Sequence, residues 1–193
     1  MALSTYANLK AAVASWLKRS DLTTQIPDFI ALAEARIRRD VRCRAMETEA
    51  TGTLAAATLV FPTRFLEARQ VSLNGYLCEY VTPQQFDDTN TAGYQYTIKG
   101  EYFHFQSSSW DYDIEYYAGF AAFSDDGDTN WLLTNAPDIY LWASLAEAYN
   151  FVQGDPSKWL ALYAKANADL RASENRARSG GPMVARPYGV YVA

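Results

Sequence analysis

The sequence predicts an α+β protein: an antiparallel helical bundle of N-terminal and C-terminal helix pairs, an inserted small antiparallel β region, and an extended C-terminal tail. Apolar residues recur at helical spacing before residue 45 and after residue 130, whereas the middle shows alternation and short turns. The end of the chain follows Gly180-Gly181 and is apolar without helical spacing. We therefore divide the chain into a helical bundle (1–45 and 130–181), a β-rich region (46–129) and a docking tail (182–193).

The N-terminal pair begins with a helix for which Ser4 is a suitable cap. Pro27 and Asp28 fall in the first turn of the second helix, where a missing N–H and a negative charge are both favourable. Helical spacing predicts that the buried side of this second helix consists of Phe29, Leu32, Ala33, Ile37 and Val41.

The C-terminal pair is signalled by Asn135 as a cap, with Pro137 and Asp138 in the first turn. Gly154 ends this helix, and Asp155-Pro156 begins the next one at once. So short a link predicts an antiparallel helical hairpin, whose second helix ends near Gly180-Gly181.

In the β region, Asn74-Gly75 lies between alternating apolar residues and predicts a two-residue hairpin, because both turn positions need φ > 0. Residues 82–86 have the pattern of a short capped helix. Strands are predicted over 94–98, 102–106 and 111–117, and the short links between them indicate an antiparallel meander.

Composition excludes several classes of protein. The chain has 193 residues, 17 Lys+Arg, 22 Asp+Glu and a net charge of −5, which argues against broad nucleic-acid binding. No apolar run is long enough to cross a membrane, and the first residues lack a signal-peptide pattern. One His and two Cys exclude most metal sites and any His-dependent triad without His104. The spacing of Cys43 and Cys78 fits reduced thiols of a cytosolic setting.

Few residues suggest chemistry. His104 could be a general base or a ligand, but no nucleophile or metal partner is spaced to meet it, which favours an ordinary strand histidine. Asp111, Asp113 and Glu115 alternate and share one strand face. That face could serve acid–base or glycosidase chemistry, remain solvated, or meet cations of a neighbouring subunit.

The segment 126–130 imitates the start of a calcium loop. Its sixth position is Trp131 instead of Gly, and its twelfth is Pro137 instead of Glu, so we interpret it as an acidic turn. We predict no catalytic residue, no metal site and no cofactor.

Two features point to macromolecular contacts. Five arginines crowd the end of the second helix: Arg36, Arg38, Arg39, Arg42 and Arg44. They could bind phosphate, dock on an acidic partner surface, or form a solvated helix face beside nearby acids. In the tail, Tyr188, Val190 and Val192 alternate as in a strand added to another sheet. Packing of the tail on its own domain is the alternative.

Short segments spread over residues 5–178 form an ordered pattern, and in order and spacing they resemble the head-to-tail adaptor (head-completion or connector) proteins of tailed bacteriophages. The segments that carry this resemblance are 16–22, 26–30, 33–37, 61–62, 65–69, 80–86, 130–133, 136–140 and 172–178.

The resemblance implies a helical bundle with an inserted β region and no enzymatic activity. It further implies a homo-oligomeric ring, usually a dodecamer, beneath the portal protein, with tail or nozzle proteins on its other face. DNA would pass through the channel without sequence-specific binding, and no membrane is involved. The protein would belong to the virion at the head–tail junction and would be assembled in the host cytoplasm.

Within this interpretation, the tail is the predicted portal-docking segment and the helix arginines are the predicted subunit or partner interface. Two other functions stay open: a carbohydrate- or protein-binding module of a phage tail, built on the Tyr-rich β region, and a hydrolase that uses Asp111, Asp113 or Glu115. The predicted portal-docking residues are Arg186, Tyr188, Val190, Tyr191 and Val192, and the predicted interface residues are Arg36, Arg38, Arg39 and Arg42.

Overall fold

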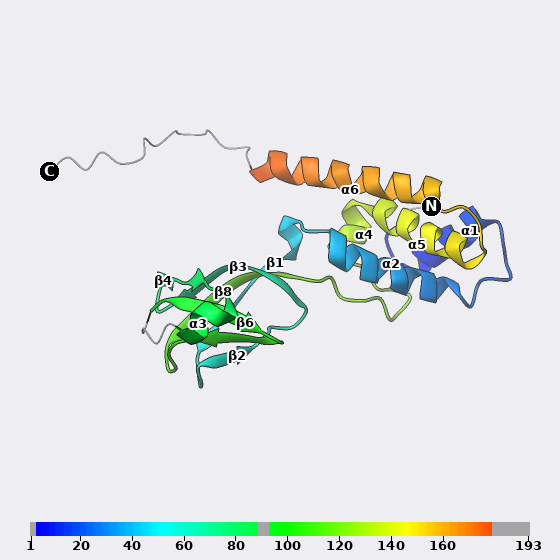
Figure 1. Cartoon of the computed structure of the whole chain (residues 1–193). Helices are drawn as coiled ribbons and strands as arrows, with labels where there is room; N and C mark the ends of the chain where they lie inside the picture. Colours follow the sequence, from blue (N-terminus) through cyan, green and yellow to red (C-terminus); the bar gives the residue numbers. More distant parts are fainter. Residues whose placement is uncertain (1–2, 89–92, 179–193) are drawn as a thin grey trace.

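The computed structural model describes residues 3–88 and 93–178, and over these residues the chain is α+β, as predicted. Figure 1 shows the long helices gathered at one end and the strands at the other. In chain order the elements are α1 (Tyr6–Leu17), α2 (Ile26–Asp40), the 3₁₀ turn η1 (Arg44–Met46), β1 (Glu47–Thr53), β2 (Thr58–Val60), β3 (Phe65–Leu73), β4 (Tyr76–Leu77), β5 (Glu79–Tyr80), α3 (Pro83–Asp88), β6 (Gln95–Lys99), β7 (Tyr102–Phe105), β8 (Asp111–Ala118), α4 (Trp131–Asn135), α5 (Pro137–Phe151) and α6 (Ser157–Arg178).

Helix α5 lies at the centre of the helical part and contacts α1, α2, α4 and α6. It is apolar on nearly every side, as expected of a helix with neighbours all around it. Tyr140 and Leu145 are among its fully buried side chains. No described helix has the length and apolar character to span a membrane. The division at residues 45, 130 and 181 stays a prediction, and residues 182–193 lie outside the described part.

Two of the predicted helix N-caps are wrong, because the capping residue is a different one in each case. Thr5, not Ser4, caps α1 and accepts a hydrogen bond from the Asn8 N–H at 3.3 Å. Asn130, not Asn135, is the cap at the start of the C-terminal helices, because its Oδ1 accepts from the Leu133 N–H at 2.9 Å. The C-terminal helices therefore begin with α4, one element earlier than predicted, and α5 begins without a side-chain cap.

The buried side of α2 differs from the prediction at one residue. Phe29, Ala33 and Ile37 are buried as expected, but Leu32 is 54% exposed. Ile26 and Ile30 complete the buried face, and at 3.6 residues per turn Leu32 lies roughly a third of a turn from its centre.

The strands form two four-stranded sheets instead of one meander: β1-β8-β3-β4 and β2-β7-β6-β5. The antiparallel β6–β7 pair is as predicted, and β5 pairs with β6 in parallel. Strand β8 does not pair with β7 but joins β1 and β3, and the hydrogen bond from the Leu54 N–H to the Trp110 carbonyl (2.9 Å) extends the β1–β8 ladder. Leu54, Phe103 and Ile114 lie in the core of this region.

Local turn signals within the β region are confirmed. Asn74 and Gly75 have φ of 49° and 80° between the paired residues Leu73 and Tyr76. In α3, the Thr82 hydroxyl accepts a hydrogen bond from the Gln85 N–H at 3.4 Å. These two elements depend on residues only a few positions apart, which explains why local sequence predicts them.

The acidic segment after β8 is a turn, as predicted, and it lies against the start of α1. The Asp128 and Asp126 carbonyls accept hydrogen bonds from the N–H groups of Tyr6 (2.8 Å) and Ala7 (3.1 Å). Lys10 forms an ion pair with the Asp126 carboxylate. The turn therefore satisfies free donors at the positive end of a helix, where negative charge is favourable.

Asn130 and Asn135 provide a matched test of the cap assignment. Asn130→Ala is expected to lower the free energy of unfolding by about 2 kcal/mol, because it removes the Leu133 cap and the 2.8 Å bond to the Tyr140 hydroxyl. Asn135→Ala should change it by less than about 0.5 kcal/mol, since Asn135 is exposed. Urea unfolding of both variants measures the difference, and equal effects would contradict the assignment.

Candidate functional site

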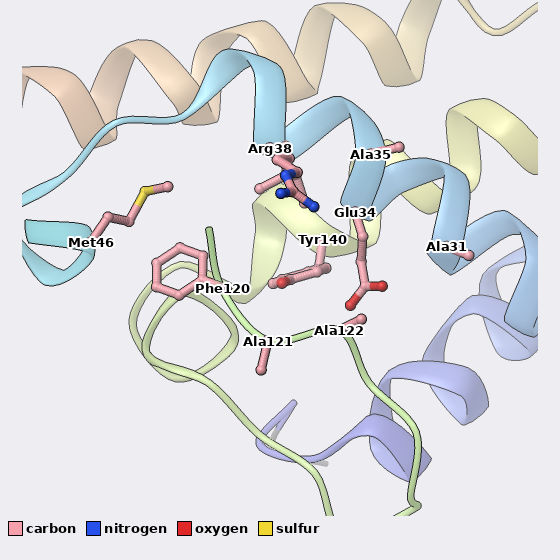
Figure 2. Close-up of a pocket in the computed structure, with 10 residues that line it drawn as sticks. Ala31, Glu34, Ala35, Arg38, Met46, Phe120, Ala121, Ala122 and Tyr140 are labelled. Atoms are coloured by element: carbon pink, nitrogen blue, oxygen red, sulfur yellow. The ribbon is translucent and has the colours of Figure 1, made fainter. Parts of the chain in front are cut away.

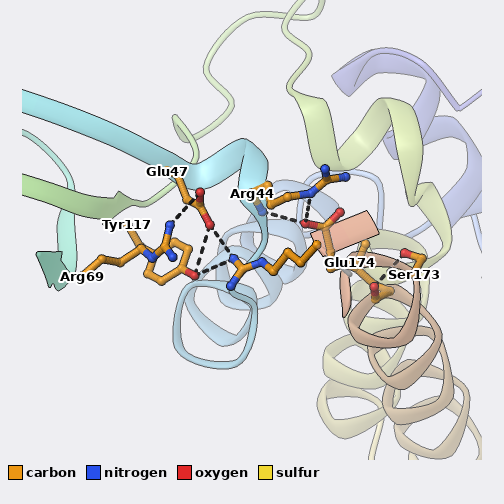
Figure 3. Close-up of polar contacts among 8 residues, drawn as sticks. Arg44, Glu47, Arg69, Tyr117, Ser173 and Glu174 are labelled. Carbon is orange, nitrogen blue, oxygen red and sulfur yellow. Dashed lines mark hydrogen bonds and ion pairs between the residues drawn. The ribbon is translucent and has the colours of Figure 1, made fainter. Parts of the chain in front are cut away.

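The end of α6 meets the β region at a cluster of charged side chains (Figure 3). Glu47, the first residue of β1, lies opposite Tyr117 of β8 in the strand register. The Arg178 guanidinium forms an ion pair with Glu47 and donates a hydrogen bond to the Tyr117 hydroxyl at 2.9 Å. We call the cluster the α6 junction. Its members are Arg44, Glu47, Arg69, Tyr117, Glu174 and Arg178.

A second arginine completes the surroundings of Glu47. Arg69 Nη1 lies 2.7 Å from Glu47 Oε2, and its guanidinium lies 5.5 Å from the centre of the Tyr117 ring. The Tyr117 hydroxyl donates to Glu47 Oε1 at 3.4 Å. Strands β1, β3 and β8 and helix α6 therefore converge on one carboxylate, at the place where the β region leaves the helices.

Glu174, one turn before Arg178, holds the other side of the junction. It is 7% exposed and accepts hydrogen bonds from the Arg44 backbone N–H (2.8 Å) and Nε (3.1 Å). Burial raises the pKa of the Glu174 carboxyl, but the bonds from Arg44 outweigh it, so the pKa lies below its ordinary value. Nothing in the local sequence marks this pair, because its members are 130 residues apart.

Two of the predicted interface arginines have partners within the chain. Arg36 forms an ion pair with Glu147 of α5, and both side chains are largely shielded from solvent. Arg42 Nη1 donates to the carbonyls of Arg38 (2.9 Å) and Val41 (2.7 Å), and its Nε lies 3.3 Å from Glu67. These two side chains stabilise the end of α2 and its contact with α5.

Arg38 and Arg39 differ from them, because both are exposed and neither forms an ion pair with any residue in 3–88 or 93–178. Arg38 lies beside Gly119, where the chain returns from β8. The predicted portal-docking residues Arg186, Tyr188, Val190, Tyr191 and Val192 lie outside the described residues.

The carboxylates considered for catalysis lie on the outer face of the β1-β8-β3-β4 sheet, while His104 is on β7 of the other sheet. The Asp111 carboxylate accepts a 2.7 Å hydrogen bond from the Thr53 hydroxyl. Glu115 lies opposite Glu49 in the register. The two sheets thus keep the histidine and these carboxylates on separate elements, with no nucleophile and base side by side among them.

A cavity of about 240 Å³ lies between α2 and the segment that follows β8 (Figure 2). Glu34 points into it from α2 and accepts a hydrogen bond from the Phe123 N–H at 3.1 Å. Burial raises the pKa of Glu34, partly offset by that bond. Alanines and Phe120 form much of the remaining lining. The contact anchors the returning segment to α2.

Other reactive groups are buried or dispersed. Cys43 and Cys78 are free thiols, and burial raises the pKa of each to about 11, which keeps them protonated near neutral pH. Within residues 3–88 and 93–178, no three His, Cys, Asp or Glu side chains are grouped to hold a metal ion.

The described residues thus form a helical part and a β region that meet at the α6 junction, with Arg38 and Arg39 exposed on α2. A family model described as SU10 adaptor protein matches residues 4–186. The chain therefore belongs to this family of bacteriophage head-to-tail adaptors, as the sequence predicted. Family membership makes it a structural component of the virion that acts with portal and tail proteins in an oligomeric assembly. A search of curated proteins finds no match to the chain.

The α6 junction predicts a pH-dependent contribution from Glu174. Glu174→Ala should lower the free energy of unfolding by about 2 kcal/mol near pH 7, because the Arg44 donors lose a charged acceptor. Since the folded-state pKa is lowered, this contribution is present above the unfolded pKa and is lost as the pH falls through the folded one.

Urea unfolding at pH 7 and at about pH 3 measures this effect. The difference between wild type and Glu174→Ala should shrink at the lower pH. Arg176→Ala, an exposed residue of the same turn, is the control and should have little effect at either pH. A difference that stays the same at both pH values would show that the Glu174 charge is not what stabilises the junction.

Proposed function

We propose that the protein forms a ring, of twelve copies, beneath the portal, joins the portal to tail or nozzle proteins, and continues the DNA channel. The family match over residues 4–186 carries this proposal. Assembly takes place in the host cytoplasm before the adaptor becomes part of the head–tail junction. DNA passes through the ring without sequence-specific contacts, in keeping with the net charge of −5, since retained phosphate contacts would slow it.

A closed ring needs two different surfaces on each subunit, because each copy contacts one neighbour on each side through heterologous patches. The α6 junction supports such an arrangement, since it holds the β region at a fixed place relative to the helices. Arg38 and Arg39 are exposed and form no ion pair with another described residue, so they are the members of the predicted interface set best suited to an acidic neighbour. Arg36 and Arg42 support the same surface from within the chain.

The first test concerns docking on the portal by the tail. Mixed with its portal, the full chain should give complexes that carry a ring in negative-stain images and in native mass spectra. A chain whose residues 182–193 are replaced by a Gly/Ser sequence of equal length should not bind, because Tyr188, Val190 and Val192 can no longer form the extended contact. Unchanged binding by the replaced chain would refute the docking role of the tail.

The second test concerns the ring interface. Reversing both exposed charges, with Arg38→Glu and Arg39→Glu together, should abolish ring assembly on the portal, because like charges would then face the acidic neighbour. The control is Lys165→Glu with Arg176→Glu, which reverses two exposed charges on α6. Circular dichroism checks that both proteins are folded. If both double variants still assemble, this surface is not an interface.

A further inference from the structure

Strand β1 is an edge strand with a free row of backbone groups. Within residues 3–88 and 93–178 it pairs with β8 alone, and five of its seven residues are exposed. The Leu54 N–H donates to the Trp110 carbonyl at 2.9 Å, and the same register places Ala50 and Gly52 in hydrogen-bonded pairs with β8. The alternate residues therefore direct their N–H and C=O groups away from β8, toward the open edge. These residues are Glu49, Thr51 and Thr53, whereas the N–H of Glu47, at the start of the strand, donates to the Arg44 carbonyl.

The described chain ends beside the first residue of this strand. Arg178, the last residue of α6, forms its ion pair with Glu47. Residues 179–193 follow, and fully extended they would span about 50 Å. Their alternating part, 186–192, has seven residues, the same number as β1. A segment that starts at the Glu47 end reaches the open edge most directly in the direction parallel to β1.

The position of Pro187 decides which side of this segment can pair. Proline has no N–H, so within a strand it must face away from its partner. In a strand paired with β1, Arg186, Tyr188, Val190 and Val192 would then direct their backbone groups toward β1. Pro187 would face the outer side, where it would also prevent further pairing at the new edge.

Side-chain direction follows from the same parity. In a parallel pair, consider a residue whose backbone N–H and C=O point toward the partner strand. Its side chain shares a sheet face with those partner residues whose backbone groups point away from it. Tyr188, Val190 and Val192 would therefore share the face of Ala50 and Leu54, which is the apolar face that packs on the second sheet. An antiparallel pair would instead place them beside Glu49 and Glu115.

The two faces of the sheet near β1 differ. On one face, a hollow of about 300 Å³ lies over the beginning of β1, the end of β8 and the segment before β3. The opposite face carries the acidic pair Glu49 and Glu115, and residues 179–193 contain no Asp or Glu side chain that would be repelled by it. One arrangement, a parallel strand on the open edge of β1, thus agrees with the place where α6 ends, the length of the tail, the position of its proline and its apolar alternation.

We infer that the open edge of β1 is a docking site for residues 186–192 of the same chain, which pair with it in parallel as an added strand. A free adaptor would in this way cover an open sheet edge and its own apolar segment at once. Docking on the portal, as proposed above, would require the portal to displace this segment from β1.

Amide hydrogen exchange of the free protein, followed residue by residue by NMR, tests the inference. The Glu49, Thr51 and Thr53 amides should exchange at least about tenfold more slowly in the full chain than in a chain truncated after Gly181. Ala50 and Gly52, whose amides bond to β8, provide the internal control and should not change.

Two tail variants form a matched pair. Val190→Pro removes an N–H that faces β1 and should abolish the slow exchange, whereas Gly189→Pro removes an outward N–H and should preserve it. Equal exchange in the full and truncated chains would overturn the inference. Protection that rises with protein concentration, together with a dimer mass, would also overturn it, by placing the segment on a second copy. Because no portal is present, failure of portal docking would leave this result unaffected.

Discussion

The antiparallel pairing of β1 with β8 is the constraint on which the arrangement of the chain depends. The β region is inserted between α2 and α4, so it must leave and re-enter the helical part at one place, and these two strands run side by side from that place. Arg178 contacts both of them at their helical end, at Glu47 and Tyr117. Helix α6 thus contacts both ends of the insertion, because a carboxylate and a phenol that face each other offer one guanidinium two acceptors.

Charged residues in this protein serve two different purposes that their types do not reveal. Arg36, Arg42 and Arg44 neutralise acids of distant elements and satisfy backbone groups inside the subunit. Arg38 and Arg39 lie on α2 with Arg36, yet they remain exposed and form no ion pair within the described part of the chain. For an adaptor this separation is useful, because unpaired arginines can recognise a partner without weakening the contacts that hold the subunit together.

The aromatic residues divide in a similar way. Trp16 is 47% exposed but packs edge-on against Trp142 and Trp159, so it closes the helical core from outside. Phe103 is fully buried between the sheets. Tyr76 and Tyr80 are more than half exposed at edge strands, which leaves aromatic area available for contacts with other molecules.

The sequence by itself determined the α+β class, the Asn74-Gly75 hairpin, the short helix after Thr82, and the break at Gly154 and Asp155 between α5 and α6, because each rests on neighbouring residues with strong backbone preferences. It also identified the adaptor family, through a pattern spread along the chain. Only the tertiary structure decided that β8 joins β1 and β3, that Leu32 is exposed, and that Glu174 holds Arg44. Those outcomes depend on contacts between residues up to 130 positions apart, and the free energy of such contacts is set by burial and geometry that no local pattern contains.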